Sequence, residues 1–297
     1  MATPSNLVIG GVSVPRVYVC GSNLLTGSSV SFEDGVGSWT TFPAGTTQIQ
    51  QYAAGNTTFY GEYVLSVQDN SASLAQGGQI SASYGSAVGG KTFVLTFFDF
   101  AMTAHTYTAQ VEAGLASPAL NADNYATATQ ARRCHVFTVG STASQTTLTI
   151  KIYGTDDADV ANQGTVFIDE VELREVEFTW TGQYEFHKKK YAWERKIQAA
   201  YELIGGEEKE FVLGYRFFTS WGYDWNDTTD EQARARIASG SHLIVYPSID
   251  KTYSVDCRWD GDYARDFPED VFVGHKGEMP LRGIRLEKII PYAYVNA

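Results

Sequence analysis

Aromatic and amide side chains occur close together in the first half of the chain, where they could bind a sugar. An aromatic ring can stack on the C–H face of a pyranose, while amide and carboxylate groups bond its hydroxyl groups. The predicted binding residues are Trp39, Tyr52, Tyr60, Tyr84, Tyr107 and Gln50, with Phe59, Gln110 and Asn124 as further candidates.

These aromatic residues also have structural explanations. Trp39 fits a core position beneath a sheet, and Tyr52 and Tyr60 flank one short loop. Tyr84 and Tyr107 lie in alternating segments, where a shift of one residue in strand register turns a side chain to the opposite face. The sequence alone therefore leaves open which of these rings are exposed.

The sequence predicts no catalytic site. Its five histidines have no HxxxH or HxH spacing, so a zinc site is not expected. The GxSxG and HExxH motifs and a glycine-rich phosphate-binding loop are also missing. A glycosidase needs two paired carboxylates, but any acidic β protein offers such pairs, so they indicate nothing here. We therefore expect that the protein is not an enzyme.

Composition and charge exclude several classes of protein. Hydrophobic residues make up 43% of the 297 residues and charged residues 19%, which excludes a disordered chain. The net charge of −12 repels phosphate, so nucleic acids and anionic membranes are not expected partners. No apolar run approaches the roughly 20 residues that span a bilayer, and we expect neither membrane insertion nor a signal peptide. Cys20, Cys134 and Cys257 are widely spaced and predict free thiols, as in a reducing cytoplasm.

The pattern between residues 62 and 175 predicts a β-sandwich. Its segments alternate apolar and polar residues, and Gly, Asn, Asp or Ser occupy the breaks between them. The two most apolar segments, 91–102 and 146–154, are expected to be central strands that face a second sheet. Segment 114–133 is expected to be an irregular connection. The natural packing is an antiparallel two-sheet jelly roll.

The sequence changes in character near residue 176, where a second β-rich domain is predicted. Segment 191–221 predicts two long paired strands around the turn sequence IGGEE. Residues 228–240 predict the one short helix, with Thr228 as its N-cap and Gly240 as its end. The predicted fold class is therefore all-β, mainly antiparallel, with a jelly roll inserted in or fused to a second β-rich domain.

Segment 7–16 is also strand-like, and it precedes the predicted jelly roll. A lone strand needs a sheet to join, so we expect it to pair with the second domain. GHKGEMP (274–280) is interpreted as an exposed loop that contacts a neighbouring subunit. The predicted domains are the N-terminal strand 1–22, the jelly roll 23–175 and the C-terminal assembly domain 176–297.

Two motifs bracket the predicted jelly roll. The opening motif is Phe32-Glu33 followed by Gly37-x-Trp39, and the closing motif is Ile168-Asp169-Glu170-Val171-x-Leu173. Together they resemble the jelly-roll carbohydrate-binding modules of the xylan- and cellulose-binding type. The resemblance implies sugar binding, and it implies that Glu33 and Asp169 hold a structural calcium ion with backbone carbonyl groups. Alternatively, Asp169 caps a turn and Glu33 is a surface acid.

A second set of motifs lies outside the jelly roll. It comprises VIGGVSVPR (8–16), WERK (193–196), GGE (205–207) and Tyr246-Pro247. This frame is similar to the tail and baseplate proteins of tailed bacteriophages. The resemblance implies a structural virion protein of the tail, baseplate or neck, made and assembled in the host cytoplasm.

The two resemblances together predict a virion protein that displays a glycan-binding module for host attachment or particle stabilisation. Its expected partners are copies of itself in a ring, other virion tail proteins and a glycan of the host cell surface. The alternative is a non-catalytic carbohydrate-binding accessory module of a polysaccharide-degrading system. Calcium is the one cofactor that the resemblance implies.

Overall fold

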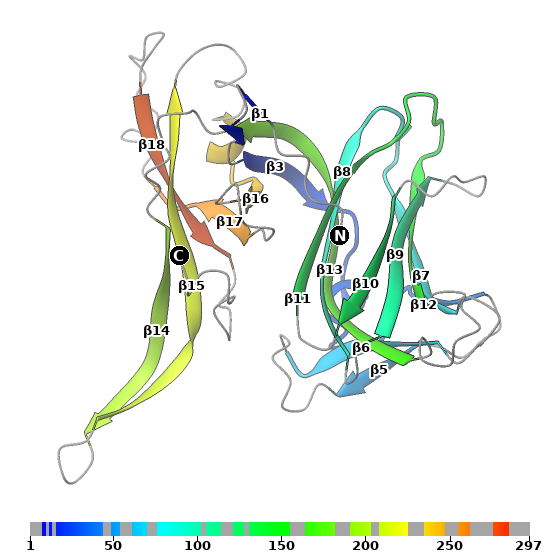
Figure 1. Cartoon of the computed structure of the whole chain (residues 1–297), viewed down its shortest axis with the longest axis horizontal. Coiled ribbons are helices and arrows are strands. Elements are labelled where there is room, and N and C mark those ends of the chain that lie inside the picture. The colour runs from blue at the N-terminus through cyan, green and yellow to red at the C-terminus, as the bar shows by residue number, and fades with distance from the viewer. Residues whose placement is uncertain are drawn as a thin grey trace. The chain divides into compact units, whose positions relative to one another are not determined.

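The computed structural model of the chain separates into two compact units (Figure 1). Unit 1 consists of Met1–Pro4 and Ser22–Val176, and unit 2 of Ser5–Gly21 and Glu177–Ala297. The structure describes residues 8–9, 12–13, 16–43, 49–53, 61–69, 76–101, 105–113, 121–127, 131–154, 164–181, 191–202, 208–224, 235–246, 255–261 and 276–284.

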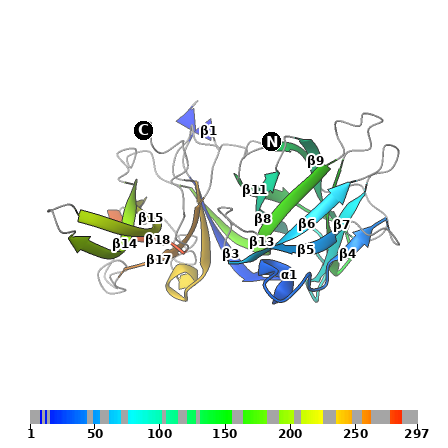
Figure 2. The same ribbon diagram turned by 90° about the horizontal axis from the view of Figure 1, so that it is seen from below.

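Unit 1 is a sandwich of two antiparallel sheets (Figures 1 and 2). One sheet has the order β10 (Asn121–Thr127), β9 (His105–Ala113), β12 (Thr147–Gly154), β7 (Gly77–Ser83) and β4 (Thr40–Phe42). The other has the order β11 (Ala131–Thr138), β8 (Thr92–Ala101), β13 (Gly164–Thr181), β6 (Tyr63–Asp69) and β5 (Ile49–Ala53). The chain passes repeatedly from one sheet to the other, as in a jelly roll.

Alternating apolar residues of both sheets form the core of unit 1. In β12 every second residue, from Leu148 to Gly154, is buried, as expected for a strand with one face in a core. Leu95 and Phe97 of β8 and Ile168 of β13 are fully buried in the same cluster. Because successive side chains of a strand point to opposite faces, the residues between these buried ones point away from the core.

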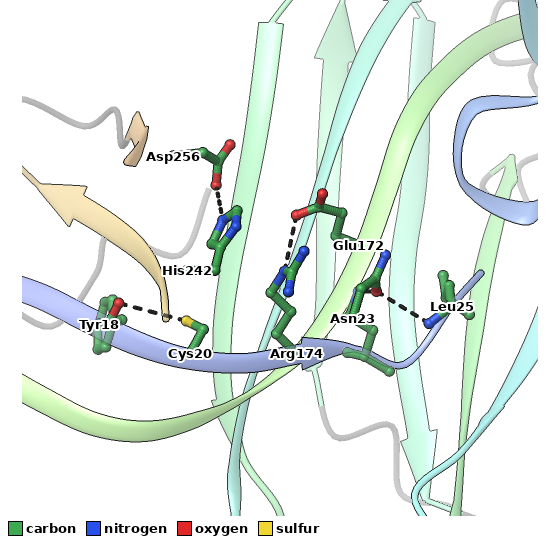
Figure 3. Close-up of polar contacts among 9 residues, drawn as sticks. Tyr18, Cys20, Asn23, Leu25, Glu172, Arg174, His242 and Asp256 are labelled. Atoms are coloured by element: carbon green, nitrogen blue, oxygen red, sulfur yellow. Dashed lines mark hydrogen bonds and ion pairs between the residues drawn. The ribbon is translucent and has the colours of Figure 1, made fainter. Parts of the chain in front are cut away.

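Asn23 ties the two ends of unit 1 together, and Figure 3 shows its contact with Leu25. Its Oδ1 accepts hydrogen bonds from the backbone N–H of Leu25 (3.2 Å) and of Leu173 (2.9 Å). The Leu24 N–H also donates to the carbonyl oxygen of Leu173 (2.8 Å). The segments through which the chain enters and leaves unit 1 therefore lie side by side.

Six strands of unit 2 pair antiparallel in one sheet. Its order is β3 (Arg16–Asn23), β16 (His242–Tyr246), β17 (Val255–Trp259), β18 (Lys276–Gly283), β15 (Glu208–Asp224) and β14 (Tyr191–Glu202). His242 Nε2 lies 2.9 Å from Asp256 Oδ1 across β16 and β17 (Figure 3), and Arg282 lies 2.8 Å from Asp260. β14 and β15 form the long antiparallel pair that segment 191–221 predicts.

The all-β, mainly antiparallel fold class is confirmed, but three segments differ from their predictions. Segment 7–16 is not a single strand: β1 (Val8–Ile9) pairs with β2 (Val12–Ser13), and it is β3 that pairs with β16. Asn121–Thr127, expected to be irregular, forms β10 because β9 offers it a partner for seven residues. Residues 276–280 belong to β18 and pair with β15, so they are not a loop.

The helices of the described residues are short. Ser28–Ser31 forms α1, which the sequence did not predict, and residues 235–238 are the described part of the predicted helix 228–240. Gly240 adopts a left-handed φ of 89° directly after that helix, as predicted for its end. Thr228, its predicted N-cap, lies outside the described residues. No helix among the described residues is long and apolar enough to span a membrane.

We expect Asn23→Ala to lower the free energy of unfolding by about 1–2 kcal/mol, because two backbone N–H groups lose their acceptor. Asn23→Asp is the control, since it keeps the accepting oxygen. Urea denaturation of both variants checks this. Equal stability of Asn23→Ala and the unmodified chain would contradict the role of Asn23 as a tie.

Candidate functional site

The outer face of the β10-β9-β12-β7-β4 sheet carries a connected set of aromatic and polar side chains. In β12 the side chains of Leu148, Ile150 and Ile152 point into the core and are fully buried. Because successive residues of a strand point to opposite faces, Lys151 and Tyr153 point away from the core. They are half-buried on the outer face of the sheet.

Two aromatic rings lie next to each other on this face. Phe42 of β4 is in register with Gly77 of β7, which in turn is in register with Tyr153 of β12. A Cβ at residue 77 would lie 2.0 Å from the Ile152 carbonyl oxygen and 2.6 Å from Tyr153 Cα, so only glycine fits there. The rings of Phe42 and Tyr153 meet across this glycine, with centroids 5.7 Å apart and planes at 56°.

Hydrogen bonds and an ion pair connect these rings to polar side chains. The Tyr153 hydroxyl donates to Gln110 Oε1 (2.6 Å), and Gln110 Nε2 donates to Glu112 Oε1 (2.8 Å). Lys151 Nζ lies 2.8 Å from Glu112 Oε2 and 4.5 Å from the centroid of the Phe42 ring. We call these five residues of β4, β9 and β12 the platform.

The platform is held in place before any ligand binds. Gln110 is 8% exposed, and the side chains of Lys151 and Glu112 are 15% and 14% exposed. Burial raises the pKa of Tyr153, and the negative charge of Glu112 raises it further, so the phenol keeps its proton and can donate to Gln110. Side chains that already have fixed partners lose little conformational entropy when a ligand binds.

Two of the predicted sugar-binding residues are in the core instead. Trp39 is buried, and its Nε1 donates to the carbonyl oxygen of Ser29 (3.0 Å). Tyr107 is fully buried, and its hydroxyl donates to Asp99 Oδ2 (2.5 Å), which also pairs with Arg133 Nε (2.9 Å). Because both rings fill the space between the sheets, the prediction that Trp39 and Tyr107 stack on a sugar is wrong.

Tyr84 and Tyr52 lie away from the platform. The Tyr84 hydroxyl donates to Glu175 Oε2 (2.5 Å), and Lys91 Nζ lies 4.9 Å from the centroid of its ring. Burial and the hydrogen bond to Glu175 raise the pKa of Tyr84. Tyr52 belongs to β5 in the other sheet, where it is 39% exposed and packs on Phe167 with centroids 4.9 Å apart.

The other predicted residues divide into three groups. Gln50 is exposed on β5, in the same strand as Tyr52. Tyr60 and Phe59 lie outside the described residues, as does the side chain of Asn124. Gln110 is the one predicted polar partner that lies in the platform.

The rest of the platform was not among the predicted binding residues. It consists of Phe42, Glu112, Lys151 and Tyr153. Segment 146–154 is predicted from its apolar residues to be a central strand. Its sequence TTLTIKIYG also alternates polar and apolar residues throughout. That alternation places Lys151 and Tyr153 on one face and was the available signal. No sequence signal brings Phe42 to Tyr153, because the pairing of β4 and β12 with β7 joins segments far apart in the chain.

Glu33, a predicted calcium ligand, binds backbone N–H groups. Its Oε1 accepts the N–H of Glu62 (3.0 Å) and of Tyr63 (3.2 Å), and its Oε2 accepts the Glu62 N–H (3.2 Å). Gly61 has a φ of +67°, and a Cβ there would lie 2.0 Å from Glu33 Oε1. Successive N–H groups after such a residue form a concavity that favours an anion, so Glu33 acts as a tie for this turn.

Asp169, the other predicted calcium ligand, is fully buried in β13. Its Oδ1 accepts the N–H of Glu170 (2.8 Å), where a bulge gives Glu170 a φ of 50°. Among the described residues, no close group of three His, Cys, Asp or Glu ligands includes Glu33 or Asp169. Calcium binding by these two residues stays a prediction of the resemblance.

No protein-family model matches this sequence, and no curated protein matches it either. Solved structures to which part of this chain is similar include the CBM22-1 xylan-binding domain of Paenibacillus barcinonensis Xyn10C (14% identity, 54% of this chain and 98% of that chain, TM-score 0.40). The C-terminal family 22 carbohydrate-binding module of Clostridium thermocellum Xyn10B is also similar (16% identity, 50% of this chain and 91% of that chain, TM-score 0.38). A third is the enzymatically active domain of tailspike protein 4 of bacteriophage CBA120 (14% identity, 52% of this chain and 21% of that chain, TM-score 0.38). Each similarity covers about half of the chain.

We expect Glu33→Ala to lower the melting temperature of the chain in the presence of a chelator, because the backbone N–H groups of Glu62 and Tyr63 lose a charged acceptor, an effect of about 1 kcal/mol. Glu33→Gln, which keeps one accepting oxygen, should lose less. If about 1 mM calcium raises the melting temperature of the unmodified chain but not that of Glu33→Ala, Glu33 belongs to a calcium site. The reason is that a ligand that binds only the folded state stabilises it. If Glu33→Ala melts normally with the chelator present, Glu33 is not a tie.

Proposed function

We propose that unit 1 is a non-catalytic carbohydrate-binding module whose ligand lies on the platform. The observation that carries the proposal is the pairing of two half-buried aromatic rings, Phe42 and Tyr153, with a connected amide, carboxylate and ammonium group on the same face. Aromatic rings present apolar surface to the C–H bonds of a sugar, and the polar groups fix its orientation.

The platform keeps hydrogen-bonding capacity after its internal bonds are made. The Tyr153 oxygen, which donates its proton to Gln110, still has lone pairs that accept. Gln110 uses one N–H on Glu112, and the Lys151 ammonium group retains further donors beside its ion pair. Sugar hydroxyl groups are both donors and acceptors, so they match such a mixed surface.

The platform lacks the acid–base arrangement of a glycosidase. Glycoside hydrolysis uses two carboxyl groups about 5–9.5 Å apart on either side of the bond that breaks. Among the described side chains of the platform, Glu112 is the one carboxylate, and it is paired with Lys151. We therefore propose binding without turnover.

For the whole chain we propose a structural virion protein of a tailed phage, in the tail, baseplate or neck, with unit 1 as the displayed module. The support is the sequence frame of unit 2 and the course of the chain, which enters unit 1 after Gly21 and leaves it after Val176. The same platform would serve a non-catalytic accessory module of a polysaccharide-degrading system equally well.

Copies of the chain in a ring are the proposed assembly. In the described part of unit 2, β14 pairs with β15 alone, so the twelve-residue β14 is an edge strand. An edge strand presents unpaired N–H and C=O groups that a strand of another chain can bond. A neighbouring copy or another tail protein is the partner that this proposal assigns to β14.

Replacing either ring of the platform should weaken binding to polysaccharide. We expect Tyr153→Ala and Phe42→Ala each to reduce affinity roughly tenfold or more, because stacking area is lost at the centre of the site. Affinity electrophoresis and calorimetry against a panel of soluble polysaccharides measure this. Tyr52→Ala is the matched control, since Tyr52 is an exposed aromatic residue of the other sheet. Loss of binding in Tyr52→Ala but not in the two platform variants would move the site to β5.

Removing unit 1 should leave unit 2 folded. Because Leu24 and Leu173 are bonded to each other, a short Gly-Ser bridge can replace residues 24–174 without separating the ends. We expect the shortened chain to keep its β structure by circular dichroism and to assemble into particles that attach less well to host cells. Failed assembly, with normal attachment of the particles that do form, would make unit 1 an assembly element and contradict its role as a displayed module.

A further inference from the structure

We infer that the Lys151–Glu112 ion pair makes the platform selective for uncharged sugars over acidic ones. This inference rests on the proposed function of the platform and adds to it the electrostatic class of the ligand. It assigns the selectivity to one identifiable pair of side chains.

The ion pair leaves the described part of the face without net charge. The outward positions of β4, β7, β9 and β12 are otherwise occupied by uncharged side chains: Thr40, Phe42, Gln79, Ser81, Ser83, Thr108, Gln110, Thr147, Thr149 and Tyr153. Lys151 would attract the carboxylate of a uronic acid, but Glu112 lies 2.8 Å from its ammonium nitrogen. The carboxylate of an acidic sugar is therefore attracted by Lys151 and repelled by Glu112 to a similar extent.

The loss of water from its carboxylate then weakens the binding of an acidic sugar. Both members of the pair are about 15% exposed, so the ligand group beside them loses much of its water. A carboxylate that gives up water without a net favourable charge is destabilised, whereas a hydroxyl group is much less affected. The net charge of −12 on the whole chain repels an acidic polysaccharide further.

Glu112 cannot easily turn away to release Lys151. Its Oε1 accepts a hydrogen bond from Gln110 Nε2 (2.8 Å), and its Oε2 faces Lys151. Gln110 is itself held by the Tyr153 hydroxyl (2.6 Å) and is buried. The carboxylate is thus held from two sides, next to the ammonium group whose charge it compensates.

The test compares neutral and acidic polysaccharides on the full chain. The probes are soluble β-glucan and galactomannan as neutral polymers, and polygalacturonate and alginate as uronic acid polymers. We expect the unmodified chain to bind at least one neutral probe about tenfold or more tightly than both uronates. Equal or tighter binding of a uronate overturns the inference while it supports sugar binding. Binding of none of the four overturns the inference, and a wider panel then tests the proposed function.

Glu112→Gln tests the assignment to this pair, because it keeps the shape of residue 112 and leaves the Lys151 charge uncompensated. We expect the ratio of uronate affinity to neutral-sugar affinity to rise about tenfold, and to fall back in the double variant Glu112→Gln with Lys151→Gln. The rise should become smaller in high salt, since it is electrostatic, although salt screens a partly buried charge less than an exposed one. An unchanged ratio in folded Glu112→Gln overturns the assignment. If that variant does not fold, the comparison of neutral and acidic probes on the unmodified chain still decides the inference.

Discussion

The burial of alternate residues of β12 determines most of what unit 1 presents on its surface. Leu148, Ile150 and Ile152 are fully buried between the two sheets, and the strand cannot rotate without exposing them. The residues between them are therefore forced outward. Lys151 and Tyr153 reach the surface for this reason, and their position depends on the packing of the core.

The neighbouring strands turn this constraint into a site. β9 places Gln110 opposite Lys151, and β7 places a glycine beside Tyr153, across which Phe42 approaches. The polar groups then bond one another, so the arrangement is fixed before a ligand arrives. A rigid, partly exposed set of rings and polar groups suits a ligand that is rich in both C–H surface and hydroxyl groups.

The sequence predicted the sheets but not the site. Alternation is a local pattern, so the strands around Leu95, Ile150 and Ile168 could be predicted from it. Asn121–Thr127 is rich in residues with low β propensity and becomes a strand through its pairing with β9, which no local pattern reveals. Tyr107 and Tyr153 lie in similar alternating segments, yet one is buried and the other faces outward. Which face of a strand is buried depends on which of its two sets of alternating residues is the more apolar. The platform depends in addition on pairing between strands that are far apart in the chain.

The position of a bound sugar on the protein shows whether the platform is its binding site. Backbone amide chemical shifts of the ¹⁵N-labelled chain would be followed during titration with the oligosaccharide that binds most tightly. If the sugar lies on the platform, the largest changes occur in β4, β9 and β12, around Phe42, Gln110 and Tyr153. Changes that concentrate in β5 around Tyr52, or in unit 2, with β12 unaffected, would rule out the platform as the binding site.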